Sequence, residues 1–139
     1  MGISEGSADL ELVFDGGALG NPGAGYGSFQ LRDREGFCEI SRLDFGDNVT
    51  NNQAEYRTLI AGLEAALGHA GSLGWHPRTL RVRVRTDSQL VVEQVLGRWK
   101  VRHPNLQPLS TRARELLARF GSTDIAWHPR VESVRILGH

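Results

Sequence analysis

At residues 12–17 the chain reads Leu12-Val13-Phe14-Asp15-Gly16-Gly17, and a glycine-rich run continues to residue 27. An apolar segment ends in a carboxylate, and the glycines after it allow a close approach of the backbone. We therefore expect a strand that ends at Asp15 and presents its carboxylate beside a glycine turn. The alternative is a β-hairpin in which Asp15 merely begins the turn. The acids found further along the chain decide between these two interpretations.

The length and composition predict a single domain. A chain of 139 residues can bury about 68–70% of its unfolded surface, so we expect one domain at residues 10–139 behind a flexible tail at residues 1–9. Cys38 is the single cysteine, which excludes an internal disulfide and a cysteine zinc cluster. No apolar run approaches the roughly 20 residues that span a bilayer. We expect a cytoplasmic monomer with no membrane partner.

The charges are divided unevenly along a chain whose net charge is zero. Residues 1–75 hold 11 acidic and 4 basic side chains, whereas residues 76–139 hold 5 acidic and 12 basic ones. If folding places the two halves side by side, one surface can hold a divalent metal and a polyanion together. The alternative is a solvated surface that is simply rich in arginine.

Hydrophobic periodicity predicts a mixed sheet. Residues 10–15, 26–32 and 37–45 read as three strands joined by short turns, which is typical of an antiparallel meander. A helix follows from Thr50, whose hydroxyl and the side chain of Gln53 form an S/T-x-x-E/Q capping box.

The second half of the chain alternates between strands and helices. Residues 80–87 have period two and predict a strand, and residues 88–96 and 109–120 predict helices. A short strand at residues 124–127 follows. The order predicts an α/β fold with a five-stranded mixed sheet, an antiparallel meander plus two parallel strands, flanked by helices.

Three carboxylates occupy special positions in this scheme: Asp15, Glu55 in the second turn of the first helix, and Asp87 at the end of the fourth strand. Clustered carboxylates repel one another and are tolerated mainly where a cation lies between them. Oxygen ligands suit Mg²⁺ or Mn²⁺, and two such ions can cleave a phosphodiester. The alternatives are a solvated helix residue for Glu55 and a helix cap for Asp87.

The acids lie in three motifs, Phe14-Asp15-Gly16-Gly17, Thr50-Asn51-Asn52-Gln53-Ala54-Glu55-Tyr56 and Thr86-Asp87-Ser88-Gln89-Leu90. In this order they resemble the motifs of type 1 ribonuclease H. The connector at residues 97–109 is similar to that of its compact bacterial and archaeal branch. The resemblance covers about residues 10 to 130.

The resemblance implies a ribonuclease H-like fold and an endonuclease that cuts the RNA strand of RNA/DNA hybrids, leaving 5′-phosphate and 3′-hydroxyl ends. It implies two Mg²⁺ ions, with Mn²⁺ as the alternative metal. Asp15 would bridge both ions, Glu55 and Asp87 would share one of them, and the Gly16 carbonyl would assist.

The resemblance also implies contacts with the substrate. Only the 2′-hydroxyl distinguishes RNA from DNA at a given site, and amides can both donate to it and accept from it. The implied contact residues are Gly16, Asn21, Thr50, Asn51, Asn52, Gln89, Trp99 and Arg130, with Thr50 on a DNA phosphate, Trp99 on the DNA strand and Arg130 near a mobile product-release position. The alternatives are a turn for Asn21, helix capping for Asn51 and Asn52, and a core position for Trp99.

The C-terminal segment departs from the family pattern. The family's Pro-Arg-Glu-x-Asn-x-x-Ala-Asp segment corresponds to residues 129–137, where Val131, Ser133 and Leu137 replace the Glu, Asn and Asp. The fourth carboxylate is therefore missing, and Glu132 is a candidate substitute. We expect a truncated C-terminal helix of one apolar turn and weakened activity that favours Mn²⁺. The alternative is a degenerate module that binds hybrid or double-stranded RNA without cutting it.

Overall fold

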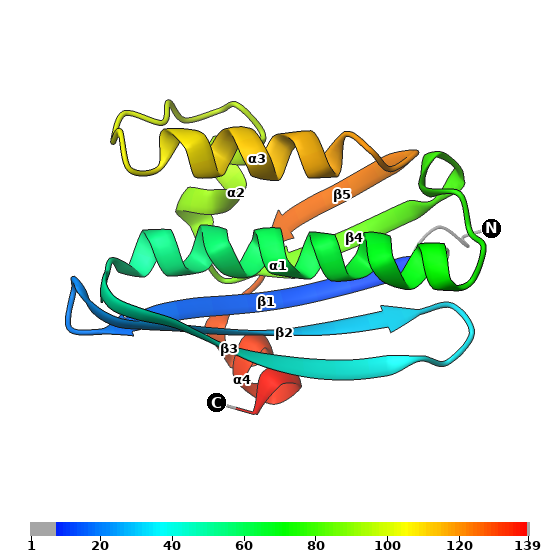
Figure 1. Cartoon of the computed structure of the whole chain (residues 1–139), viewed down its shortest axis with the longest axis horizontal. Helices are drawn as coiled ribbons and strands as arrows, with labels where there is room; N and C mark the ends of the chain where they lie inside the picture. Colours follow the sequence, from blue (N-terminus) through cyan, green and yellow to red (C-terminus); the bar gives the residue numbers. More distant parts are fainter. Residues whose placement is uncertain (1–7, 139) are drawn as a thin grey trace.

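The computed structural model describes residues 8–138 and contains a five-stranded sheet of order β3-β2-β1-β4-β5 (Figure 1). The strands β1 (Leu10–Leu19), β2 (Gly23–Asp33) and β3 (Cys38–Val49) form an antiparallel meander. The strand β4 (Arg81–Thr86) runs parallel to β1, and β5 (Ser122–Trp127) runs parallel to β4. The predicted mixed sheet is confirmed.

The expected end of the first strand at Asp15 is wrong, because β1 continues to Leu19. Gly16 and Gly17 do not turn; they pair with Gly27 and Tyr26 of β2. On the other side of β1 the pairing with β4 ends at Val13. Asp15 therefore lies just beyond the end of the parallel pairing, where the chain leaving β4 can approach it.

Helices cover both faces of the sheet (Figure 1). The long helix α1 (Asn51–Ser72) lies along β1 and β2, with α2 (Gln89–Val95) and α3 (Gln107–Leu117) beside it, and a short 3₁₀ helix η2 (Pro77–Thr79) precedes β4. The helix α4 (Arg130–Leu137) packs on the opposite face against β1 and β2. The predicted capping box at the start of α1 is confirmed. No helix in residues 8–138 is long and apolar enough to cross a membrane.

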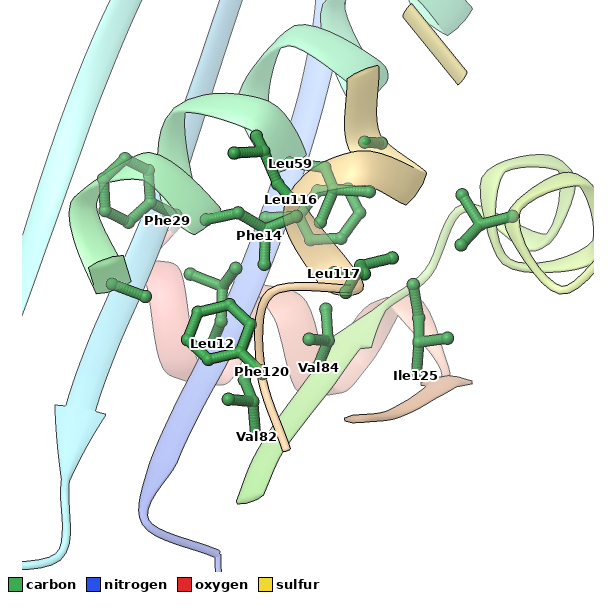
Figure 2. Packing of buried hydrophobic residues seen from close by; sticks show 14 of the residues in the cluster. Leu12, Phe14, Phe29, Leu59, Val82, Val84, Leu116, Leu117, Phe120 and Ile125 are labelled. Atoms are coloured by element: carbon green, nitrogen blue, oxygen red, sulfur yellow. The ribbon is translucent and has the colours of Figure 1, made fainter. Parts of the chain in front are cut away.

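The core forms between α1, α3 and one face of the sheet (Figure 2). The strands contribute alternate residues, so that Leu12 and Phe14 of β1 are fully buried while Val13 between them is not. Leu59 of α1 and Leu116 of α3 are also fully buried and pack against these side chains. This packing fixes α1 over β1.

A buried polar network ties the helices to the connector that precedes α3. The Tyr56 hydroxyl of α1 donates to Gln94 Oε1 at 2.8 Å, and Gln94 Nε2 donates to the Lys100 carbonyl at 3.3 Å. Arg114 of α3 donates to the Gln94 carbonyl at 2.9 Å. The buried Tyr56 and Gln94 side chains would be costly to bury without their partners, so Gln94 holds the connector against α1 and α3.

The C-terminal segment differs from the sequence expectation. It forms two helical turns, α4, rather than one. Leu137 is fully buried, and its carbonyl accepts a hydrogen bond from Arg42 Nη2 of β3 at 3.1 Å. The position at which the resemblance expects an acid is therefore the apolar anchor of α4 on the sheet.

Of the expected flexible tail at residues 1–9, residues 1–7 lie outside the described residues, and the prediction is wrong for residue 9. Asp9 is part of the fold, because its backbone N–H donates to the Arg81 carbonyl at 2.8 Å and its Oδ2 accepts from the Arg81 N–H at 2.7 Å. Arg34 pairs with the other carboxylate oxygen at 2.6 Å.

Helix α1 approaches β1 most tightly at Gly16. A methyl carbon placed on Gly16 would lie 2.7 Å from the carbonyl carbon of Ala54 and 2.8 Å from the backbone nitrogen of Glu55. Both neighbours are backbone atoms, which cannot rotate away. Only glycine at this position lets residues 54 and 55 of the helix lie against the strand.

We predict that Gly16→Ala lowers the free energy of unfolding by about 1–3 kcal/mol, because the added methyl group forces α1 away from β1. Urea denaturation measures the change. The matched control is Gly68→Ala in the same helix, where an added carbon meets nothing within 4 Å, and here we expect a gain of about 0.5–1 kcal/mol. Equal effects at the two positions would contradict the packing argument.

Candidate metal centre

The structure brings the three predicted carboxylates together. Asp15 comes from β1, Glu55 from the second turn of α1, and Asp87 from the turn between β4 and α2. One carboxylate oxygen from each lies within 4.8 Å of the others. The parallel pairing of β1 with β4 and the close contact at Gly16 produce this convergence.

The cluster is largely withdrawn from water. Asp15 is 5% exposed, and the Asp87 side chain is 8% exposed. Burial, together with the negative charges of Asp15 and Asp87, raises the pKa of Glu55 to about 7, against the opposing effects of the Ser88 hydrogen bond and the charge of Arg130. A carboxyl group in this state is unfavourable in its charged form unless a cation is present.

The unsatisfied atom in the cluster also points to a cation. Asp87 Oδ2 is buried and has no hydrogen-bond partner, which is costly for a charged oxygen. Three carboxylates with a buried, unbonded oxygen form a hard-oxygen donor set that fits Mg²⁺ or Mn²⁺. The residues present therefore fit a divalent metal ion.

Ser88 positions Glu55, a role that the sequence reasoning missed. Its hydroxyl donates to Glu55 Oε1 at 2.9 Å and accepts from the Val91 N–H at 3.4 Å as the N-cap of α2. The cap is therefore Ser88, and the alternative interpretation of Asp87 as the helix cap is wrong. A serine directly before the first helical residue is the sequence signal that identifies such a cap.

Asn21 and Asn51 join the β1–β2 turn to the start of α1. Asn51 Oδ1 accepts from the Ala18 N–H at 2.8 Å, and the Asn51 N–H donates to Asn21 Oδ1 at 3.0 Å. Asn21 lies in the turn, as its alternative predicted, but the capping alternative for Asn51 is wrong, because Thr50 caps α1 and the Asn51 side chain bonds to β1. Because these bonds use the side-chain oxygens, they do not engage either amide NH₂ group, which can still donate to a ligand.

A pocket at the start of α1 gathers further candidates. Asn21, Thr50 and Asn52 line a cavity of about 240 Å³ together with His103, Asn105 and Leu106 of the connector. Thr50 also caps α1 by accepting from the Gln53 N–H at 3.1 Å. His103 and Asn105 were not predicted as site residues, because nothing in the local sequence places the connector beside residues 50–52.

The remaining candidates are exposed, and one of them, Arg130, lies beside the cluster. Gln89 is exposed at the first position of α2. Trp99 is 46% exposed, so the alternative that places it in the core is wrong. Arg130 begins α4, and its Nη1 lies 3.7 Å from Asp87 Oδ2.

Glu132 does not join the carboxylate cluster. It accepts hydrogen bonds from Arg135 Nη2 at 2.7 Å and Arg135 Nε at 3.2 Å, and this partner lowers the pKa of its carboxyl group. The structure therefore gives Glu132 a different partner from the one that a substitute fourth ligand requires.

Comparison with known proteins agrees with the fold and the motifs. Residues 13–135 match the family described as "Reverse transcriptase-like". Among curated proteins, Ribonuclease HI of Halobacterium salinarum is 38% identical over 126 residues, covering 91% of this chain and 59% of that protein. Ribonuclease H of Syntrophotalea carbinolica is 33% identical, covering 91% of this chain and 80% of that protein.

Solved structures of ribonuclease H proteins are similar to this fold. The N-terminal RNase H domain of Rv2228c from Mycobacterium tuberculosis superposes with a TM-score of 0.77 at 36% identity, covering 94% of this chain and 91% of that one. LC11-RNase H1 in complex with RNA/DNA hybrid gives a TM-score of 0.79 at 30% identity, covering 91% of this chain and 90% of that one.

The chain spans 31% of the curated bifunctional protein Rv2228c, to which it is 43% identical over 121 residues. It spans 59% of the Halobacterium enzyme and 80% of the Syntrophotalea enzyme. The match nevertheless includes all three carboxylate motifs and nearly the whole described fold. This chain belongs to the ribonuclease H family.

Proposed function

We propose that this protein is an endoribonuclease that hydrolyses the RNA strand of RNA/DNA hybrids and leaves 5′-phosphate and 3′-hydroxyl ends. The observation that carries the proposal is the convergence of Asp15, Glu55 and Asp87 within 4.8 Å. The relatives named ribonuclease H and the neighbour in complex with an RNA/DNA hybrid support it.

Asp15, Glu55 and Asp87 would hold two Mg²⁺ ions, with Mn²⁺ as the alternative, and the Gly16 carbonyl would add a ligand. When bound, such ions supply the activation of water and the stabilisation of the leaving oxygen of a phosphodiester. The protein's own contribution is to hold the three carboxylate side chains in place. In this assignment Asp15 would serve both ions and Glu55 and Asp87 would share one of them, and the Ser88 hydroxyl fixes the orientation of Glu55.

Recognition of the hybrid would come from polar residues in the β1–β2 turn and at the starts of α1 and α2. Side-chain amides can read the 2′-hydroxyl because they donate and accept without charge, and we assign this role to Asn21, Asn51, Asn52 and Gln89. Thr50, in the pocket with Asn52, would meet a DNA phosphate. Exposed Trp99 would pack on the DNA strand, and Arg130 would meet a phosphate at the mouth of the site.

Further assignments concern the setting of the reaction. We assign residues 10–139, together with Asp9, to one domain that acts as a monomer in the cytoplasm. The exposed free Cys38 supports this location, because unpaired thiols are usual in a reducing compartment.

A second candidate function is a module that binds hybrid or double-stranded RNA without cutting it. The observation that favours it is the buried Leu137 at the position of the family's fourth acid. Cleavage of a labelled substrate separates the two functions, because the second candidate binds the hybrid and leaves it intact.

We predict that Asp15→Asn lowers the cleavage rate of an end-labelled RNA/DNA hybrid by more than about 100-fold, since removal of a direct ligand exceeds the 10–100-fold cost of losing an outer partner. Hybrid affinity should change little. Gel analysis of the labelled products checks both the rate and the chemistry of the ends. An intact hybrid with the unmodified protein in Mg²⁺ and in Mn²⁺ would leave the binding module as the function.

We predict that Mn²⁺ supports faster cleavage than Mg²⁺ at equal concentration. Mg²⁺ demands near-ideal octahedral geometry and dehydrates reluctantly, which a site with three carboxylates in place of four satisfies poorly. Initial rates across a titration of each metal test this expectation. Faster turnover in Mg²⁺ would refute it.

We predict that the affinity for a divalent ion depends on pH through Glu55. With a pKa of about 7, above the ordinary value near 4.5, Glu55 holds a proton in the metal-free folded protein that the ion must displace. The apparent affinity should therefore fall by about tenfold for each pH unit below 7, as measured by titration calorimetry with Mn²⁺.

The same pKa determines how the stability of the metal-free protein depends on pH. Because the folded protein binds this proton more tightly than the unfolded chain, the metal-free free energy of unfolding should decrease as the pH rises from about 4.5 to about 7. Glu55→Gln is the control for both measurements. A pH dependence that survives this substitution would show that another group is responsible.

A further inference from the structure

Arg130 and Asp87 form an asymmetric ion pair at the edge of the carboxylate cluster. The Arg130 side chain is 72% exposed, whereas the Asp87 side chain is 8% exposed, and Nη1 lies 3.7 Å from Oδ2. The same oxygen is buried and has no hydrogen-bond partner. At this distance the guanidinium acts on the oxygen through its charge and makes no hydrogen bond.

The charges of the four side chains show what this pairing does. When ionised, Asp15, Glu55 and Asp87 carry three negative charges, and Arg130 supplies one positive charge beside them. With Arg130 included, the net charge of the group is therefore two negative charges. Without Arg130 the same ligands would present three negative charges to the ion.

We propose that Arg130 is a positioning residue that serves as an internal counter-cation of the cluster, pairing with Asp87 in the metal-free protein and releasing it when a divalent ion binds. The inference rests on the proposed function, because it requires the cluster to hold a metal. It assigns Arg130 a role in setting the metal affinity, in addition to its contact with substrate.

The exposure of Arg130 makes this exchange feasible. An exposed guanidinium on a long side chain can leave its partner at little cost, because surface ion pairs contribute little to stability. Buried Asp87, in contrast, needs a positive charge in either state. Once released, the guanidinium stays at the mouth of the site, where its planar donors suit a phosphate of the hybrid.

The size of the effect follows from Coulomb's law. The electrostatic energy between a unit charge and a ligand oxygen about 4 Å away is substantial near a protein surface. Because Arg130 is exposed, solvent screening reduces this energy. We therefore expect the dissociation constant for the metal to change by about five- to tenfold.

The experiment compares Arg130→Ala, Arg130→Lys and Arg135→Ala with the unmodified protein. Arg135 is the matched control, because it lies in the same helix, its side chain is 67% exposed and it pairs with an acid, Glu132, at 2.7 Å. The dissociation constant for Mn²⁺ alone is measured by electron paramagnetic resonance at constant ionic strength without nucleic acid. Thermal denaturation confirms that each variant is folded.

We expect Arg130→Ala to bind Mn²⁺ about five- to tenfold more tightly, Arg130→Lys to stay close to the unmodified protein, and Arg135→Ala to change less than about twofold. In cleavage assays, Arg130→Ala should need less Mn²⁺ for half-maximal rate while its KM for the hybrid rises. A structural role of Arg130 alone would not move these two constants in opposite directions.

The outcomes separate this inference from the proposed function. Equal Mn²⁺ affinity in Arg130→Ala and the unmodified protein, with hybrid cleavage intact, overturns the role of Arg130 and leaves the nuclease standing. Equal tightening in Arg130→Ala and Arg135→Ala also overturns it, because the effect would then reflect net charge. A folded protein that binds no Mn²⁺ and cuts no hybrid overturns both.

Discussion

The close contact between α1 and β1 at Gly16 is the constraint on which the site depends. A side chain at Gly16 would meet the backbone of Ala54 and Glu55, so this glycine sets the distance between helix and strand. The helix is held there by a buried core in which Leu12, Phe14 and Leu59 have no exposed surface. The same packing that stabilises the fold therefore carries Glu55 to Asp15.

The cost of this arrangement is electrostatic. Three acids lie close together in a largely buried environment, and burial together with mutual repulsion raises the pKa of Glu55 to about 7. The fold offsets part of the cost through the Ser88 hydroxyl and the charge of Arg130, and a divalent cation would offset more. Strongly perturbed acids of this kind are typical of functional sites rather than of ordinary surfaces.

In the C-terminal helix α4, a packing residue, Leu137, occupies the position at which the family pattern has an acid. Leu137 is fully buried, and its carbonyl is bonded to Arg42 of β3, so α4 is held on the sheet by an apolar anchor. An acid at such a position would be costly to bury unless it was paired. The departure from the family pattern at this residue thus has a clear structural consequence, while the three-acid cluster forms without it.

Local chemistry was sufficient for several features of the fold. The capping box of Thr50 and Gln53, the period-two strand before Asp87 and the lone Gly-rich run after Phe14 depend on near neighbours in the chain, and they led to the mixed sheet and to the three acids. The strand order was not predicted, because the parallel pairing of β1 with β4 joins residues far apart in the chain.

Contacts between residues far apart in the chain could not be predicted from the sequence. The extension of β1 to Leu19 depends on pairing with β2, and the inclusion of Asp9 depends on Arg81. Ser88 bonds to Glu55, Asn51 bonds to Asn21, and His103 lines a pocket with Asn21 and Thr50. These residues lie about 30 to 80 positions apart in the sequence, so only tertiary packing brings them together. The sequence by itself determined which acids are present and which elements carry them; the tertiary structure decided how close they lie, because their separation is set by where the backbone of α1 can rest on β1.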